Sequence, residues 1–160
     1  MIVLDASAGC GLTLDHPKAE ALRRLMLDGE KIVAPELYLS EVTHVMQKLV
    51  RGNRITVREA GEYAREAVSL VDEFVPMSGL YQEALSESIR LSHSSYDLFY
   101  FVLARRNAAT LFSMDQRLID LAMRNGLNCV FGTEVALGES WTIRAEIEDA
   151  AKLTTAVPQN

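Results

Sequence analysis

An α/β fold built on a parallel sheet is the fold class that the sequence predicts. Short runs of β-branched and other apolar residues alternate along the chain with longer segments whose apolar residues recur every three or four positions. The strand-like runs are apolar throughout, which is typical of parallel strands covered on both faces. We therefore expect a central parallel sheet of four to five short strands with helices on both of its faces.

The first half of the chain predicts, in order, a strand over 2–4, a loop of small residues, a helix within 16–30, a strand over 31–36 and a helix over 36–53. The first strand stops at Asp5, where the β-branched run ends. Gly29 and Gly52 stand where the two helices are expected to end, and Pro35 ends the second strand.

The second half predicts helices over 56–72 and 80–93 around the short segment 74–77, then a helix over 97–107, a strand over 110–114, a helix over 115–125 and a strand over 128–131. The helix over 97–107 is apolar on every side and is expected to be buried. Residues 133–160 fit either strand alternation or a short helix, and 151–160 are expected to form a flexible tail.

Length and composition indicate one folded domain, expected over residues 1–150. Of the 160 residues, 49% are hydrophobic and 24% are charged, which excludes a disordered chain. Cys10 and Cys129 form no zinc-type spacing and are expected to be free thiols in a reducing compartment. The start lacks the features of a signal peptide, and no run approaches the ~20 apolar residues of a membrane span, so we expect a cytoplasmic protein.

The net charge of −6 argues against broad electrostatic attachment to nucleic acid, which is normally led by a basic face. An acidic protein can still process phosphodiesters if its carboxylates hold a divalent metal and a local group of basic residues receives the strand. The charge therefore disfavours one mode of binding and leaves this other mode open.

Two aspartates stand directly after predicted strands. Asp5 ends the first strand, and Asp115 follows the run over 110–114. Ligands of open parallel sheets bind at the carboxyl ends of the strands, so both side chains are expected at the same edge. The alternative is helix capping, worth about 0.5–2 kcal/mol, and for Asp115 alone capping is the better explanation. Asp97 precedes the buried helix, and for it the two explanations are balanced.

Glu41 is the carboxylate that capping does not explain. It lies inside the helix over 36–53 and falls between Leu37 and Val45, within the apolar arc. An inward carboxylate is costly unless it is paired, hydrogen-bonded or bound to metal. Lys48 is a conceivable partner, but helix geometry places it well away from Glu41. The four acidic residues together predict an all-oxygen site for Mg²⁺ or Mn²⁺, suited to phosphodiester hydrolysis.

Four segments resemble the PIN-domain family, and specifically the small VapC-type ribonuclease toxins of bacterial toxin–antitoxin pairs. The resemblance covers about residues 1–131 and rests on the segments IVLDASA, APELYLSEVTHVM, SYDLFYFVLARR and TLFSMDQRL. It implies a PIN-like fold and a metal-dependent endoribonuclease whose acidic residues are Asp5, Glu41, Asp97 and Asp115. It also implies a homodimer and inhibition by a small cognate antitoxin. The chain departs from the family pattern at Thr43 and His44, where asparagine is common, and at Ser113, where threonine is common.

Further residues are candidates of second rank. The resemblance suggests that Ser7 orients Asp5 or reaches metal through water, although a helix cap explains Ser7 equally well, and Ser113 keeps the hydroxyl of the family threonine. Basic residues that could receive RNA phosphates form a group near the end of the Glu41 helix, Lys48, Arg51, Arg54 and Arg58, with Arg105, Arg106 and Arg117 as further candidates. A solvated helix end explains that group too. His44 is expected to be structural.

Three other functions remain alternatives at this point. A catalytically silent PIN-like module would bind RNA or a protein partner without cutting. A phosphoacceptor receiver domain would place an acidic pair after the first strand, where this chain has Asp5 followed by Ala6. A haloacid-dehalogenase-like phosphatase would have an aspartate two residues after Asp5, at the position of Ser7. The last two are disfavoured on these grounds.

Overall fold

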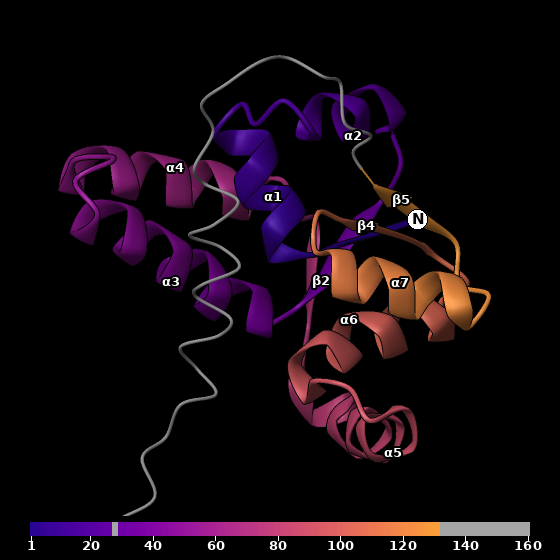
Figure 1. The fold of residues 1–160 in the computed structure, drawn as a ribbon. Helices are drawn as coiled ribbons and strands as arrows, with labels where there is room; N and C mark the ends of the chain where they lie inside the picture. The colour runs from indigo at the N-terminus through magenta and orange to yellow at the C-terminus, as the bar shows by residue number, and fades with distance from the viewer. Residues whose placement is uncertain (27–28, 132–160) are drawn as a thin grey trace, which may run out of the picture.

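The computed structural model describes residues 1–26 and 29–131, and this part of the chain has the predicted α/β fold (Figure 1). Its strands are β1 (Ile2–Leu4), β2 (Ile32–Pro35), β3 (Glu73–Val75), β4 (Thr110–Ser113) and β5 (Cys129–Phe131). They form one sheet in the order β3-β2-β1-β4-β5, and every neighbouring pair is parallel. The expectation of a parallel sheet of four to five short strands is confirmed.

Helices cover both faces of this sheet, as predicted. They are α1 (Ala6–Thr13), α2 (Ala19–Leu25), α3 (Leu37–Arg51), α4 (Val57–Ser69), α5 (Tyr81–Leu91), α6 (Ser95–Arg106) and α7 (Gln116–Arg124), with a short 3₁₀ turn, η1 (Met77–Gly79). In Figure 1, α5, α6 and α7 lie on one side of the sheet and α1 and α2 on the other, while α3 and α4 run side by side. Within the described residues, no helix combines the length and apolar character needed to cross a membrane.

The helix α6 forms the centre of the core. All residues from Leu98 to Ala104 are buried, which confirms that this helix is surrounded by protein. At its carboxyl end, the Arg105 and Arg106 guanidinium groups bind the Glu83 carboxylate of α5, each at 2.6 Å. These ion pairs hold α5 against the outer side of α6. They therefore fix the two helices relative to each other.

The chain after Asp5 was predicted to be a loop, and this prediction is wrong. Helix α1 begins at Ala6, immediately after the β1 strand and its Asp5 cap. The sequence did not predict this helix because it contains Gly9 and Gly11, and glycine has low helix propensity. The segment 74–77, not assigned to the sheet in advance, contributes to the edge strand β3. The expectations for 133–160, including the domain end at 150 and the tail, lie outside the described residues.

Gly9 has a packing role that explains its presence in a helix. A Cβ atom at this position would lie 2.0 Å from Tyr38 Oη and 2.8 Å from Tyr38 Cζ. Tyr38 of α3 is fully buried, and its hydroxyl donates a hydrogen bond of 2.8 Å to the Ala67 carbonyl of α4. The absence of a side chain at Gly9 thus leaves space for the Tyr38 ring, which links α3 to α4 through its hydrogen bond.

We predict that Gly9→Ala destabilises the protein by about 1–3 kcal/mol because the added methyl group displaces the rigidly held Tyr38 ring. Gly61→Ala is the matched control: Gly61 lies in α4 with nothing within 4 Å of an added Cβ, so alanine there should stabilise by about 0.5–1 kcal/mol. Urea unfolding of both variants measures the difference. Equal effects at the two positions would contradict the packing role of Gly9.

Candidate active site

Asp5 follows β1 directly and is almost completely buried, with 4% of the residue exposed. Its Oδ1 atom caps α1 by accepting a hydrogen bond from the Ala8 N–H at 2.8 Å, and it accepts another from Ser7 Oγ at 2.6 Å. Its Oδ2 atom accepts a hydrogen bond from Ser113 Oγ. These donors partly compensate for the burial of the carboxylate and fix its orientation at the sheet edge.

Two serine hydroxyls connect the carboxyl ends of the adjacent strands β1 and β4. Ser7 Oγ donates to Asp5 and accepts a hydrogen bond of 2.8 Å from the Met114 N–H. Ser113 Oγ also donates to Asp5 and accepts one of 3.0 Å from the Asp115 N–H. Each hydroxyl therefore uses both its donor and its acceptor capacity to tie the two strand ends together. Asp5 and Asp115 lie at the same edge, as expected.

Asp115 is the N-cap of α7. Its Oδ1 atom accepts hydrogen bonds from the backbone N–H groups of Arg117 at 2.8 Å and Leu118 at 3.4 Å. The capping explanation is therefore right for this oxygen. Within the described part of the chain, Oδ2 takes no hydrogen bond, so capping leaves one carboxylate oxygen available at the sheet edge.

Asp97 does not cap α6. The helix begins at Ser95, its N-cap residue Ser94 makes no side-chain cap hydrogen bond, and Asp97 lies within the first turn. Asp97 Oδ2 instead lies 2.8 Å from His93 Nε2, in a pair whose side chains are 21% and 18% exposed respectively. Of the two explanations for Asp97, helix capping is therefore the weaker.

Glu41 lies on the second turn of α3 and is partly buried. Its Oε2 atom accepts a hydrogen bond from the hydroxyl of Tyr100, a residue of α6 that is 2% exposed. The partner considered from the sequence was a cation such as Lys48, whereas the partner found is a neutral phenol. The Glu41 carboxylate is therefore hydrogen-bonded, but its partner does not neutralise its negative charge.

Electrostatic interactions link the four carboxylates, which we call the carboxylate cluster. Burial and, to a smaller extent, the charges of Asp5, Asp97 and Asp115 together raise the pKa of Glu41 to about 7, while the hydrogen bond from Tyr100 opposes the rise. Burial also raises the pKa of Asp5 to about 6, with a contribution from Asp115. The pKa of Asp97 is raised to about 6 by burial and by Asp115, while His93 and Arg117 oppose the rise. Negative charge that His93 and Arg117 offset only in part is thus concentrated around these four residues.

The basic residues considered from the sequence occupy different places. Lys48 and Arg51 lie on the last turns of α3, roughly 10–15 Å along the helix from Glu41 at 1.5 Å per residue, and Arg54 follows the helix end. Arg105 and Arg106 bind Glu83 and face α5. Arg117 lies in the first turn of α7, near Asp115, and acts electrostatically on Asp97. Arg117 is therefore the cation of this set that the structure brings to the carboxylates.

Sequence reasoning missed His93 as a neighbour of the cluster, and it placed Tyr100 only within a helix expected to be buried. His93 and Asp97 are four residues apart, a spacing that brings two side chains together within one helix. Here it gave only a weak signal, because His93 lies in the turn before α6 rather than on the helix. Tyr100 is a core residue whose hydroxyl reaches Glu41, and the sequence contains no indication of that pairing across 59 positions. His44 is exposed on α3.

The donor set of the cluster is entirely oxygen, which suits Mg²⁺ or Mn²⁺. In the described residues, no three His, Cys, Asp or Glu side chains already stand close enough together to hold an ion. Four carboxylates that repel one another and are each held by a separate hydrogen-bond partner are expected to stand apart without a cation. Cys10 and Cys129 are free thiols.

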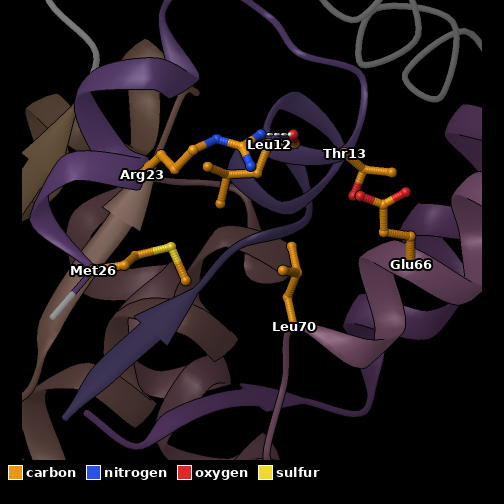
Figure 2. Close-up of a pocket in the computed structure, with 6 residues that line it drawn as sticks. All are labelled: Leu12, Thr13, Arg23, Met26, Glu66 and Leu70. Carbon is orange, nitrogen blue, oxygen red and sulfur yellow. Dashed lines mark hydrogen bonds between the residues drawn. The ribbon is translucent and has the colours of Figure 1, made fainter. Parts of the chain in front are cut away.

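A hollow of about 250 Å³ lies elsewhere, between α1, α2 and α4 (Figure 2). Its lining consists of Leu12, Thr13, Arg23, Met26, Glu66 and Leu70. The Arg23 guanidinium donates to the Leu12 carbonyl at 2.6 Å, and Thr13 Oγ1 is buried without a hydrogen-bond partner among the described residues. None of the four clustered carboxylates lines this hollow, so it is separate from the candidate active site.

Comparison with solved structures finds this fold in other proteins. PAE2754 from Pyrobaculum aerophilum is 21% identical, with a TM-score of 0.59 over 74% of this chain and 77% of that one. The VapC20 toxin of Mycobacterium tuberculosis, described as cleaving the sarcin-ricin loop, is 18% identical, with a TM-score of 0.57 over 76% and 95%. VapBC2 from Rickettsia felis, bound to a promoter DNA fragment, is 16% identical, with a TM-score of 0.58 over 81% and 98%.

These identities establish similarity of fold. A comparison with curated proteins gives no match. The family described as PIN domain matches residues 2–123, a span that contains β1 to β4 and all four clustered carboxylates. Because this match extends over well more than half of the chain, the protein belongs to the PIN domain family.

Proposed function

We propose that this protein is a divalent-metal-dependent endoribonuclease that hydrolyses RNA phosphodiester bonds. The observation that carries the proposal is the electrostatic link among Asp5, Glu41, Asp97 and Asp115, of which Asp5 and Asp115 meet through Ser113 at the carboxyl ends of β1 and β4. Among the described residues, no lysine or arginine forms a salt bridge with any of the four. A folded protein keeps such a cluster at a cost in stability, and binding a cation would offset that cost.

The residues present fit Mg²⁺ or Mn²⁺ as the cation. Three carboxylate oxygens, Glu41 Oε1, Asp97 Oδ1 and Asp115 Oδ2, take no hydrogen bond within the described residues, and Asp5 adds a fourth carboxylate with fixed orientation. Bound there, one or two ions would lower the pKa of a water molecule and neutralise charge on the phosphate and on the leaving oxygen.

The protein's own groups would position the reaction. Ser7 and Ser113 hold Asp5 rigidly, and we assign them positioning roles rather than direct contact with RNA. Arg117, exposed at the start of α7, would receive a phosphate next to the carboxylates. Lys48, Arg51 and Arg54 would contact the RNA strand farther along α3, which lets an acidic protein bind its substrate through a local basic surface.

RNA as the substrate and a toxin role are supported by the similar structures. VapC20 is described as a toxin that cleaves the sarcin-ricin loop, and VapBC2 is described as bound to a DNA fragment from its promoter. We extend to this chain a VapC-type toxin role, a cognate antitoxin as partner, homodimer formation and a cytoplasmic location. Each follows from the family and fold rather than from a contact in the structure.

A catalytically silent PIN module that binds RNA or a protein is the second candidate. It is favoured by one observation, the separation of the carboxylates in the described residues, where no group of three is close enough to hold an ion. The two candidates differ in their response to metal: the nuclease should cleave RNA with Mg²⁺ or Mn²⁺ and stop in EDTA, whereas the silent module would do neither.

We predict that Asp97→Asn lowers the rate of Mg²⁺-dependent RNA cleavage by about 100-fold or more, since a loss of ~3 kcal/mol of charge stabilisation corresponds to that factor. Asp120→Asn is the matched control: Asp120 lies on α7 and binds the Gln116 amide, outside the cluster. Cleavage of a fluorescent RNA substrate measures the rates, with circular dichroism to verify folding. Undiminished cleavage by folded Asp97→Asn would refute the site assignment.

We predict that Glu41→Gln stabilises the metal-free protein at pH 8. The folded-state pKa of Glu41, about 7, exceeds its ordinary value of 4.5, so the folded state binds the proton more tightly than the unfolded state. Stability therefore falls as pH rises from about 4.5 to 7, by about 3 kcal/mol at most, and the glutamine variant escapes this loss. Melting in EDTA should show a Tm increase of about 3–8 °C at pH 8 and little change at pH 4.5.

The control for this measurement is Glu62→Gln, on the exposed face of α4, where Glu62 pairs with Arg58. It should show no gain at pH 8. Mg²⁺ should raise the Tm of the unmodified protein at pH 8 more than that of Glu41→Gln. A Glu41→Gln variant that is less stable than the parent at pH 8 in EDTA would contradict the uncompensated charge.

A further inference from the structure

His93 lies between α5 and α6, at a turn that is closely defined by hydrogen bonds. The Ser88 hydroxyl donates to the His93 carbonyl at 2.7 Å, and the His93 N–H donates to the Ser88 carbonyl at 3.2 Å. These two contacts fix the backbone of His93 relative to the end of α5. The position of its imidazole is therefore set by the fold rather than by a freely moving loop.

The turn uses an uncommon backbone conformation. Ser92, the C-cap of α5, has φ 49° and ψ 47°, the left-handed region that favours glycine. A non-glycine residue there carries strain of about 1–2 kcal/mol, which the neighbouring contacts must offset. The left-handed residue reverses the chain direction after α5, and the next residue, His93, then faces the first turn of α6.

The geometry defines the hydrogen bond between His93 and Asp97. His93 Nε2 and Asp97 Oδ2 are 2.8 Å apart, and both side chains are mostly buried. An ionised carboxylate can only accept, so Nε2 carries the proton and donates. Asp97 Oδ1 takes no hydrogen bond among the described residues, which leaves it available to another ligand.

The orientation of the Asp97 carboxylate depends on a single hydrogen-bond donor, whereas Asp5 and Asp115 each have more than one. Asp5 is held by two serine hydroxyls and a backbone N–H, and Asp115 is held by two backbone N–H groups of α7. Asp97 is held by His93 alone within the described part of the chain. Removal of the imidazole would leave its carboxylate free to rotate.

We propose that His93 is the positioning residue of Asp97: it holds Oδ2 through Nε2 and presents Oδ1 to a divalent cation in the carboxylate cluster. The proposal rests on the proposed metal-dependent function. Hydrogen bonds to ligating carboxylates fix their orientation, and loss of such a partner typically costs 10–100-fold in metal affinity. His93 acts on Asp97 and contacts neither RNA nor the reacting phosphate.

The test compares His93→Gln with His93→Met. The two replacements have similar length and volume, and glutamine can supply an N–H donor near the position of Nε2, whereas methionine cannot. Mn²⁺ serves as the probe, titrated into the full chain and followed by calorimetry and by electron paramagnetic resonance. His44→Met, at an exposed histidine of α3 outside the cluster, is the control for loss of an imidazole.

We predict that His93→Met weakens Mn²⁺ binding by about 10–100-fold, while His93→Gln keeps most of the affinity and His44→Met keeps all of it. RNA cleavage by His93→Met should recover at saturating Mn²⁺, with an unchanged KM for RNA, because the defect lies in metal binding. Folding of each variant is verified by thermal melting.

Four results would overturn this inference. Equal Mn²⁺ affinity of His93→Met and the unmodified protein would show that Asp97 needs no positioning. Equal loss in folded His93→Gln and His93→Met would show that the N–H donor is not what matters. Cleavage that stays low at saturating Mn²⁺, with unchanged affinity, would assign His93 to proton transfer. Failure of the unmodified protein to bind Mn²⁺ would instead refute the proposed function, and this inference with it.

Discussion

The buried carboxylate of Asp5 is the constraint on which the rest of the site depends. It ends the central strand β1, starts α1 and accepts hydrogen bonds from hydroxyls on both the β1 and the β4 sides of the sheet. Each hydroxyl in turn orders the backbone that leads into α7. One anion thus fixes the relative position of two strand ends and two helix starts, and Asp115 is located by the same network.

Much of the fold follows from local pattern in the sequence. Apolar runs predicted β1, β2, β4 and β5, and Gly52 and Asn125 mark helix ends where they were expected. Helix α1 was not predictable from propensity, because Gly9 is required by the Tyr38 ring of a helix that comes later in the chain. Glu41 was found by its place in an apolar arc. Its partner Tyr100 was not, because a contact across 59 positions leaves no local signal.

The hydrogen bonds to the four carboxylates come mostly from neutral donors rather than from cations. Tyr100 and the two serines provide hydrogen bonds without positive charge, so the electric field of the cluster remains negative. An arginine in place of Tyr100 would instead neutralise the charge of Glu41. His93 and Arg117, at the border of the cluster, provide limited compensation. The choice of partners thus leaves negative charge in place, which is what the proposed metal site requires.

The central position of β1 in the order β3-β2-β1-β4-β5 has a consequence for the timing of synthesis. β1 is made before the other four described strands, and one of its two partners, β4, is made more than a hundred residues later. Until β4 has left the ribosome, one edge of β1 is unpaired and Asp5 lacks the hydroxyl of Ser113. Contacts between distant segments form slowly and late in folding. The carboxylate cluster therefore does not exist in a growing chain, and any activity it confers begins only when nearly the whole domain has been made.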